Sequence, residues 1–415
     1  MKEHEASQIH PASSLTGRAG GESGGVSDFD PIRPYNPDEL PGVLQELMAD
    51  AQFMQVASQM VPDLKQRLSM LQSSSATEKG RVLTNLDIQK MFFYPLVKHI
   101  IKTCSKGIDL ALPEGFDREQ PHTFVTNHRD IVLDSAFLSS LLVDNGFPTT
   151  VEIAIGDNLL IFPWIKKLVR INKSFIVQRS LPPRQAFAAS IVMSRYMHYA
   201  INEKRENIWI AQREGRAKDS DDRTQDAILK MMAMGGEGSV IDRLKNLHIV
   251  PMALSYEYDP CDYLKAEEFQ QKRDMQGFKK SREDDLKNMQ TGIFGQKGRI
   301  HFEAAPCIDE WLDTLDPATP KTEIFPLVAR HIDHEIHRCY RLYPSNYIAA
   351  DELCGGRKRP HAQYYSKADQ EAFDFYLDSR LAKADLQNPD YDFLRECILT
   401  MYANPVFNHE AALKE

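Results

Sequence analysis

The sequence has few cysteines and no long hydrophobic run. Its six cysteines are spread over 415 residues, and no two of them form a Cys-x-x-Cys pair. This spacing indicates neither a disulfide framework nor a zinc site, and it fits a reducing cytoplasm best. Lys, Arg or Pro interrupts each apolar stretch well short of the ~18 residues that a membrane-spanning helix needs, and no apolar signal core follows the N-terminal charges. We therefore expect a cytoplasmic protein whose membrane contact is peripheral, on the inner face.

Positive charge is also in the minority, with 50 Lys and Arg residues against 59 Asp and Glu. The formal net charge is −9 at pH 7, so the molecule as a whole shows no sign of nucleic-acid binding, and we predict no such partner. The composition is 42% hydrophobic and 26% charged, which is typical of a globular protein. The length allows one large domain or two ordinary ones.

The chain divides by composition into four parts. Residues 1–34 are rich in Ser, Gly and charge and cannot bury enough apolar surface to fold, so we expect a disordered tail. Residues 35–110 show apolar side chains at three- and four-residue spacing, which predicts helices, and residues 311–415 are also predicted to be helical. Residues 111–310 alternate short β-prone runs with helical patterns. This alternation predicts an α/β domain with a mostly parallel sheet flanked by helices.

The strand candidates indicate where a site should lie. They are residues 123–126, 151–155, 175–177, 208–211, 249–256 and 299–303. In open α/β sheets, sites lie outside the carboxyl ends of the strands. His128, Arg179 and the run Arg213-Glu214-Gly215-Arg216 all follow such an end. Pro251 lies inside one candidate and predicts an edge strand or a bulge, because proline cannot donate to the ladder.

His128 lies between two aspartates just past a predicted strand. Asp134 opens the next helical pattern, where the helix dipole favours a carboxylate. A hydrogen bond from an imidazole N–H to this carboxylate fixes the tautomer, so the other ring nitrogen becomes a base near neutral pH. No protein nucleophile is evident beside it. Such a base suits attack by a hydroxyl of the substrate itself on an activated acyl group.

Two basic segments are candidates for contact with phosphate or membrane. From residue 158 to 202 there is no Asp or Glu, and Phe162 and Trp164 lie among the cations. This composition fits either a solvated basic face or a phosphate site beside a membrane-facing patch, and the position of Arg179 after a strand favours phosphate binding for it. Residues 89–108 hold four lysines and no acid. That helix either lies at a membrane interface or packs on the sheet with its lysines in water, and we favour the second.

A third cluster of cations follows the strand at residues 208–211. Gly215 permits a tight turn there, with Arg213, Arg216 and Lys218 around it. Arginine binds phosphate oxygens in a bidentate manner, so the cluster is a candidate phosphate site, with a surface turn as the alternative.

The segment "HIDHEIHR" looks at first like a metal site. It places His331, His334 and His337 at intervals of three. The best zinc signature uses histidines four residues apart with a nearby third ligand. We therefore predict a polar helix face and no metal.

Taken in order, four blocks resemble the glycerophospholipid acyltransferases, most closely their glycerol-3-phosphate acyltransferase branch. The first is "NHRDIVLDSAFL", similar to a His-x4-Asp block. The second, "GDNLLIFPWIKKLVRINKSFIVQRS", is similar to the block that ends in an apolar strand and an arginine that contacts the acceptor phosphate. The third is "REGRAKD", similar to a Glu-Gly-x-Arg block, and the fourth is the proline-bearing strand "IVPMALSYEY". The resemblance covers roughly residues 112–306.

The resemblance implies a fold of the glycerolipid acyltransferase type and a reaction. His128, oriented by Asp134, removes a proton from the acceptor hydroxyl, which attacks the thioester of acyl-CoA or acyl carrier protein. The acceptor implied is glycerol-3-phosphate or a lysophospholipid such as lysophosphatidate. The substrate-binding residues implied are Arg179, Glu214, Gly215, Arg216 and Lys218. Backbone N–H groups stabilise the oxyanion, and no metal or bound cofactor is needed.

Two departures from the family pattern leave choices open. Asp134 lies one position further from His128 than in the pattern, so Asp130 competes for the orienting role. We favour Asp134, because "DSAFLSSLL" continues like the family's helix. In the third block the arginine follows the glycine directly, where the family spaces it one residue later, so either Arg216 or Lys218 takes that role. The acceptor therefore stays open.

Three alternatives remain. The acceptor could be a non-phosphate lipid, such as an acylated amino acid. The chain could be a non-catalytic, peripheral lipid-binding or scaffolding protein that keeps the fold, although the presence of His128, Asp134 and Arg179 argues against this. A hydrolase would need a nucleophile beside His128. The G-x-S-x-G match at residues 21–25 lies in the expected tail, without the strand and helix that a nucleophile elbow requires.

Overall fold

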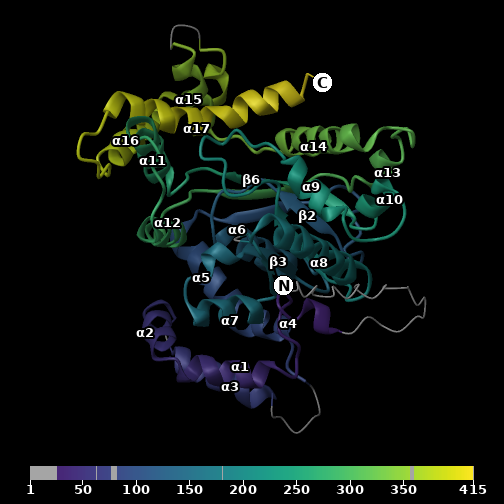
Figure 1. The fold of residues 1–415 in the computed structure, drawn as a ribbon. Helices are drawn as coiled ribbons and strands as arrows, with labels where there is room; N and C mark the ends of the chain where they lie inside the picture. The colour runs from purple at the N-terminus through teal and green to yellow at the C-terminus, as the bar shows by residue number, and fades with distance from the viewer. Residues whose placement is uncertain (1–25, 62, 76–81, 180, 356–358, 415) are drawn as a thin grey trace, which may run out of the picture.

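A computed structural model describes residues 26–61, 63–75, 82–179, 181–355 and 359–414. Within these residues, seven strands form one sheet in the order β1-β7-β6-β2-β5-β3-β4 (Figure 1). The strands are β1 (Ile108–Ala111), β2 (Thr123–Thr126), β3 (Val151–Gly156), β4 (Ser174–Val177), β5 (Asn207–Ala211), β6 (Ile249–Tyr256) and β7 (Ile300–Ala304). Five of them, from β6 to β4, are mutually parallel, whereas β7 pairs antiparallel with β6 and parallel with β1. The mostly parallel sheet expected from the sequence is confirmed.

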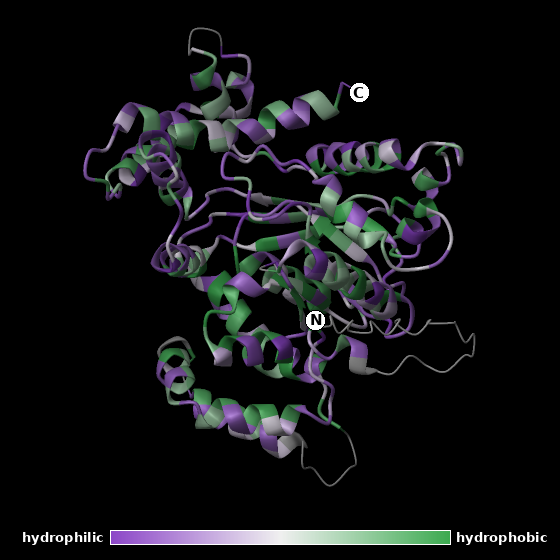
Figure 2. Ribbon diagram, in the orientation of Figure 1, coloured by the Kyte–Doolittle hydropathy of each residue, from purple (hydrophilic) through white to green (hydrophobic). Residues whose placement is uncertain are grey.

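Helices cover both faces of the sheet. They are α1 (Leu40–Ala49), α2 (Ala51–Met60), α3 (Leu64–Ser75), α4 (Asn85–Ile88), α5 (Tyr94–Cys104), α6 (Leu133–Asp144), α7 (Pro163–Ile171), α8 (Pro183–Asn202), α9 (Asp226–Met232), α10 (Val240–Lys245), α11 (Asp262–Asp274), α12 (Arg282–Phe294), α13 (Asp309–Leu312), α14 (Lys321–Arg338), α15 (Pro344–Leu353), α16 (Lys367–Leu381) and α17 (Tyr391–Ala412). Along β2, Val125 packs with α8, α9 and α14, whereas Phe124 packs with α5 and α6. Side chains that alternate between two helix-covered faces explain why this strand is buried throughout. Hydrophobic residues accordingly gather in the strands and the helices beside them (Figure 2).

The six strands predicted from the sequence are all present, and β1 is the one that the pattern missed. Its four residues, "IDLA", include a charge, and the strand lies at the edge of the sheet beside β7. Its side chains are half-buried or exposed, so the apolar run that marks the inner strands is absent here.

Pro251 does not mark an edge strand, because β6 lies between β7 and β2. The carbonyl of Pro251 accepts a hydrogen bond from the backbone N–H of Ala305 at 2.8 Å, so this residue faces β7. The β6–β7 ladder begins one residue later, at Met252. The N–H that proline lacks therefore falls at the end of the ladder, where its loss costs little.

The prediction that residues 1–34 are disordered does not hold for residues 26–34. Residues 1–25 lie outside the described residues, and so does the G-x-S-x-G match. Residues 26–34, in contrast, pack on the sheet. The ring of Phe29 lies 5.3 Å from that of Tyr196 on α8, and the carbonyl of Ile32 accepts a hydrogen bond from the backbone N–H of Ile176 in β4 at 2.9 Å. Two apolar side chains in a polar segment are enough here, because the sheet offers them a place to be buried.

Two helical layers flank the sheet on opposite sides of the view in Figure 1. The N-terminal helices α1–α3 share a hydrophobic cluster with α7, and the C-terminal helices α15–α17 share another with α11. The long α14 belongs instead to the core of the sheet, through residues such as Val328 and Ile332.

Candidate active site

The candidate base stands where β2 leaves the sheet. The ladder between β2 and β6 ends with Thr126 opposite Met252. The next side chain, Asn127, is fully buried and takes over the pairing. Its Oδ1 atom accepts a hydrogen bond from the backbone N–H of Leu254 at 2.7 Å, and its Nδ2 atom donates to the Leu254 carbonyl at 3.0 Å. The loop that carries His128 therefore starts from a position that the sheet itself determines.

His128 and Asp134 make the contact predicted from the sequence. The Nδ1 atom of His128 lies 2.7 Å from Oδ2 of Asp134. The same oxygen accepts hydrogen bonds from the backbone N–H groups of Arg129 at 2.7 Å and Asp130 at 3.0 Å. Asp134 is fully buried, whereas 12% of the His128 side chain is exposed. Because the carboxylate only accepts, Nδ1 carries the proton and Nε2 keeps the lone pair that a general base needs.

Asp130, the competing partner, has a different task. Its Oδ1 atom accepts hydrogen bonds from the backbone N–H groups of Val132 at 2.9 Å and Leu133 at 2.8 Å, so it closes the turn that leads into α6. Burial and the neighbouring Asp134 raise the pKa of the Asp130 carboxyl. The contact with His128 thus falls to Asp134, despite the extra residue between them.

Arg179 and Glu214 meet past the ends of β4 and β5. The Nη1 atom of Arg179 lies 3.4 Å from Oε1 of Glu214, and the Arg179 backbone N–H donates to Asp157 Oδ1. The guanidinium crosses the end of β3 at Gly156, where an added Cβ atom would lie 3.1 Å from its Cζ atom. Glycine permits this close approach. About a third of the Arg179 side chain, 34%, is exposed, so it is open to an anion from solvent.

These side chains share one edge of the sheet. β2, β5, β3 and β4 are consecutive, parallel strands, so their carboxyl ends point the same way. With neighbouring strands about 4.8 Å apart, the strand before His128 and the strand before Arg179 are separated by ~14 Å, with Glu214 between them. Gly215, at φ +69°, makes the turn after Glu214 in the left-handed conformation that favours glycine. The candidate base and the candidate anion ligand therefore lie at the same edge of the sheet.

Residues 108–255, which hold this edge of the sheet, match the family model described as Acyltransferase. They form an acyltransferase-family domain. The first three motif blocks lie inside the match, so the family resemblance stated from the sequence is confirmed. Among solved structures, that of the 1-acyl-sn-glycerophosphate acyltransferase PlsC from Thermotoga maritima is similar at 10% identity and a TM-score of 0.32, over 73% of this chain and 97% of that one. No curated protein matches the chain.

In this acyltransferase domain, two of the predicted phosphate ligands turn toward other helices. Arg216 donates from Nη2 to the Asn288 side chain on α12 at 3.2 Å, and Lys218 forms an ion pair with Glu268 on α11. Burial lowers the pKa of Lys218 to about 8, although Glu268 acts in the opposite direction. Both cations therefore tie their loop to the protein. The expectation that they join Arg179 around a phosphate finds no support in these contacts.

A buried aspartate that the motifs did not reveal anchors the catalytic loop. Asp222 accepts hydrogen bonds from both Nη atoms of Arg129, at 3.2 and 2.6 Å, and from the Tyr340 hydroxyl at 2.6 Å. Its backbone carbonyl accepts from His337 Nε2 at 2.8 Å, and all four side chains are buried. The loop that bears His128 is thus fastened to α14 and the residues after it.

The histidines of "HIDHEIHR" point in different directions. His331 stacks on Trp311 with ring centroids 3.9 Å apart, and burial lowers its pKa to about 4. His334 donates from Nε2 to a carbonyl of α17 at 3.1 Å, and His337 donates to the backbone of Asp222. The three rings therefore serve packing and hydrogen bonding in α14, as a polar helix face would.

Within the part of the chain that the structure describes, one group brings three metal-ligand atoms within 4.8 Å of one another, namely His248, Cys307 and Asp309. It lies at the edge of the sheet opposite His128, because His248 precedes β6 and the other two follow the antiparallel β7. His248 Nδ1 and Asp309 Oδ2 are 2.6 Å apart. Two ligands of one tetrahedral zinc, at bond lengths near 2.0 Å, would lie about 3.3 Å apart. The group is therefore a hydrogen-bonded pair with a thiol beside it.

The candidate membrane-facing patch on α7, one of two interpretations of that segment, is covered by protein. The ring of Trp164 lies 5.6 Å from that of Phe53 on α2, and Lys167 pairs with Glu46 on α1 at 2.8 Å. Helices α1–α3 thus occupy this face, on the lower side of Figure 1. The apolar residues of the patch form part of a core.

The other basic segment packs as favoured from the sequence. In α5, Val97, Ile100 and Ile101 are buried in the cluster of β2 and α6, whereas Lys98 and Lys102 are exposed. None of the helices in the described residues is both long and apolar enough to cross a membrane.

Proposed function

We propose that this acyltransferase moves a fatty acyl group from an acyl thioester, acyl-CoA or acyl carrier protein, to a hydroxyl of glycerol-3-phosphate or a lysophospholipid, in phospholipid biosynthesis. The observation that carries the proposal is the contact of 2.7 Å between the partly exposed His128 and the fully buried Asp134, at the end of a central strand of an acyltransferase-family domain. A histidine held in one tautomer is suited to take a proton from a bound hydroxyl.

In the proposed reaction, His128 Nε2 takes the proton of the acceptor hydroxyl while the hydroxyl oxygen attacks the thioester carbonyl. The tetrahedral intermediate then collapses, the C–S bond breaks, and the imidazolium returns the proton to the leaving thiolate. Asp134 stabilises the imidazolium between the two transfers. The histidine ends neutral, the acceptor carries the new ester, and the chemistry needs no metal and no bound cofactor.

Arg179 is the proposed ligand of the acceptor phosphate. It lies at the strand ends and is partly exposed, and Glu214 holds it by one contact of 3.4 Å that a phosphate can replace. Arg179→Ala should raise KM for glycerol-3-phosphate or lysophosphatidate by roughly 10–100-fold and change kcat less, because one charge-assisted contact to the acceptor is lost. Steady-state kinetics at saturating acyl donor measure both.

Arg195→Ala is the matched control for this test. That arginine lies on α8, pairs with Asp28 at 3.7 Å and has no proposed contact with the acceptor, so its loss should leave KM unchanged. An Arg179→Ala enzyme with the wild-type KM would remove Arg179 from the phosphate site.

A non-phosphate acceptor, such as an acylated amino acid, is the second candidate. The ion pair of Lys218 with Glu268 and the contact of Arg216 with Asn288 support it, because they leave fewer cations for a phosphate. A panel of acceptors with one acyl-CoA separates the two classes. Preference for a phosphate-free acceptor would favour the second.

We further propose that the protein works in the cytoplasm, peripheral on the inner face of the membrane. The support is a set of lysines on and beside α5, such as Lys90, Lys98 and Lys102, which remain exposed although the helix packs on the sheet, and which suit anionic lipid headgroups. Cosedimentation with vesicles should then be strong for anionic and weak for zwitterionic lipid, and should weaken at high salt. Equal binding to both vesicles would contradict the proposed contact.

A further inference from the structure

The two oxygens of the Asp134 carboxylate accept different numbers of hydrogen bonds. Its Oδ2 atom accepts from His128 Nδ1 and from two backbone N–H groups. Its Oδ1 atom accepts from the hydroxyl of Tyr256 at 2.9 Å. Within the described residues, no other side chain donates a hydrogen bond to Oδ1, and both side chains are fully or almost fully buried. The Tyr256 phenol therefore acts together with the three donors to Oδ2 in fixing the orientation of the carboxylate about its Cβ–Cγ bond.

Tyr256 is itself held in place from several sides. It is the last residue of β6, and its backbone is in register with Ile300 of the antiparallel β7. Its ring lies 6.4 Å from that of Phe137 on α6, the helix whose first turn carries Asp134. The hydroxyl thus links the end of one strand to the start of the helix that supplies the carboxylate. Because packing fixes the position of the ring, the hydroxyl is held where it can donate to Asp134.

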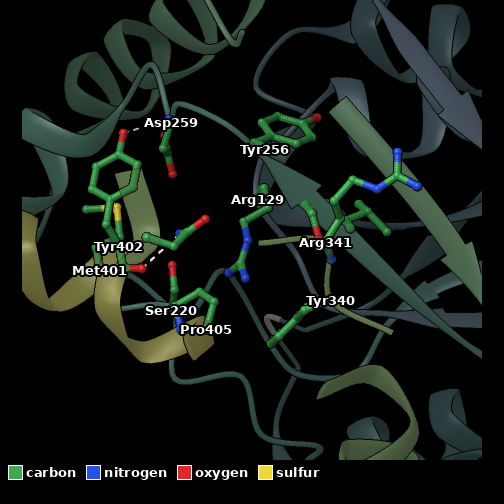
Figure 3. A pocket seen from close by; sticks show the side chains of 12 residues that line it. Arg129, Ser220, Tyr256, Asp259, Tyr340, Arg341, Met401, Tyr402 and Pro405 are labelled. Carbon is green, nitrogen blue, oxygen red and sulfur yellow. Dashed lines mark hydrogen bonds between the residues drawn. The ribbon is translucent and has the colours of Figure 1, made fainter. Parts of the chain in front are cut away.

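The Tyr256 hydroxyl does not point into the neighbouring cavity. The ring forms part of the wall of a small cavity that Arg129, Tyr340 and Tyr402 also line. Figure 3 shows the hydroxyl pointing away from the side chains of Arg129 and Tyr402. Burial, and after it the charge of Asp134, raises the pKa of the Tyr256 phenol well above its ordinary value, so it keeps its proton as a donor.

We infer that Tyr256 is a positioning residue of the acyl transfer: it holds the Asp134 carboxylate so that the opposite oxygen faces His128 and keeps the base in one tautomer and one orientation. The inference rests on the proposed function of the His128–Asp134 pair. Tyr256 touches no substrate in this account and acts through Asp134. It also limits the pull of the carboxylate on the imidazole, because a donor to one oxygen withdraws charge from the other.

The test is Tyr256→Phe, which removes the hydroxyl and keeps the ring. Without that donor, the carboxylate attracts the imidazolium more strongly, so His128 holds its proton to higher pH. The acidic limb of the kcat/KM profile should move up by roughly 0.5–1 pH unit. At neutral pH, kcat should fall about tenfold, with KM for both substrates within about twofold, because the lost contact serves the transition state.

Tyr343→Phe is the matched control. Tyr343 is also a buried tyrosine, and within the described residues its hydroxyl has no hydrogen-bond partner. Its variant should keep the wild-type kcat and acidic limb. A Tyr256→Phe enzyme that matches the wild type in both would overturn the inference, and so would a loss of activity without a shift of the limb, since that is the mark of a structural role alone.

Two further measurements separate this inference from the proposed function and from folding. Imidazole NMR follows the titration midpoint of His128 without any substrate, and Tyr256→Phe should raise that midpoint even if no acceptor is ever found. Incorporation of 3-fluorotyrosine at position 256 keeps the donor and strengthens it, so it should move the limb and the midpoint in the opposite direction. A wild-type enzyme inactive on every acceptor would refute the proposed function, whereas an unmoved midpoint would refute the role of Tyr256.

Discussion

Replacing His128 with alanine should lower kcat for acyl transfer by roughly 10²–10⁴-fold, the range expected when a general base is removed. The fold should survive, because the imidazole is partly exposed to solvent and makes one hydrogen bond, to Asp134. Circular dichroism and thermal unfolding check the fold, and product formation from a labelled acyl thioester checks the rate. His99→Ala, at an exposed position on α5, is the control and should behave as the wild type.

The two aspartates near His128 should respond in unequal ways. Asp134→Asn replaces the acceptor of the Nδ1 proton by an amide that can offer N–H, which favours the wrong tautomer and should lower kcat by about 10³-fold or more. Asp130→Asn keeps the oxygen that Val132 and Leu133 use, so its effect should stay below about tenfold. The reverse order would assign the orienting role to Asp130.

Among the substitutions proposed here, Asp222→Ala should cause the largest loss of stability, about 3–5 kcal/mol in the free energy of unfolding. The change leaves the Arg129 guanidinium buried without its bidentate partner and removes the acceptor of the Tyr340 hydroxyl. Burial disfavours that guanidinium charge, and Asp222 outweighs the penalty and raises the Arg129 pKa, so the charge cannot be shed in the variant. Denaturant unfolding measures the loss.

Two controls make the Asp222 result specific. Asp226→Ala removes an exposed carboxylate whose contact with Lys230 is 3.9 Å long, and it should change stability by less than about 0.5 kcal/mol. The double variant Asp222→Ala/Arg129→Met removes both buried charges and should be more stable than Asp222→Ala alone. A double variant as unstable as the sum of its parts would show that the pair is not coupled.

The features that depend on residues close together in the chain could be predicted from the sequence. Six strands stood out because their short, mostly apolar runs are typical of buried strands, and His128 stood out because it follows such a strand. Asp134 was within reach of the same pattern, six residues away. Asp222 and Tyr256 left no such signal. Their partners lie 93 and 122 residues away in the chain, and only the fold brings them together.

Two candidate roles inferred from the sequence depend on which surfaces the fold covers. The basic, aromatic segment of α7 has the composition of an interfacial helix, but α1–α3 bury Trp164. Lys218 has the spacing of a phosphate ligand, but Glu268 on α11, fifty residues further on, neutralises it. Each side chain could contact either a ligand or another part of the protein. A single sequence does not show which distant segment will pack beside it.

The central claim is that the acyl group passes to a hydroxyl of an acceptor, with His128 as the base. The most direct measurement offers one acyl-CoA together with glycerol-3-phosphate and lysophosphatidate to the wild-type protein and to His128→Ala, and identifies the products by mass spectrometry. We predict an O-acylated acceptor formed in step with released CoA by the wild type, and almost none of either with His128→Ala. Free fatty acid in place of the ester, or equal ester formation by the two proteins, would contradict the account.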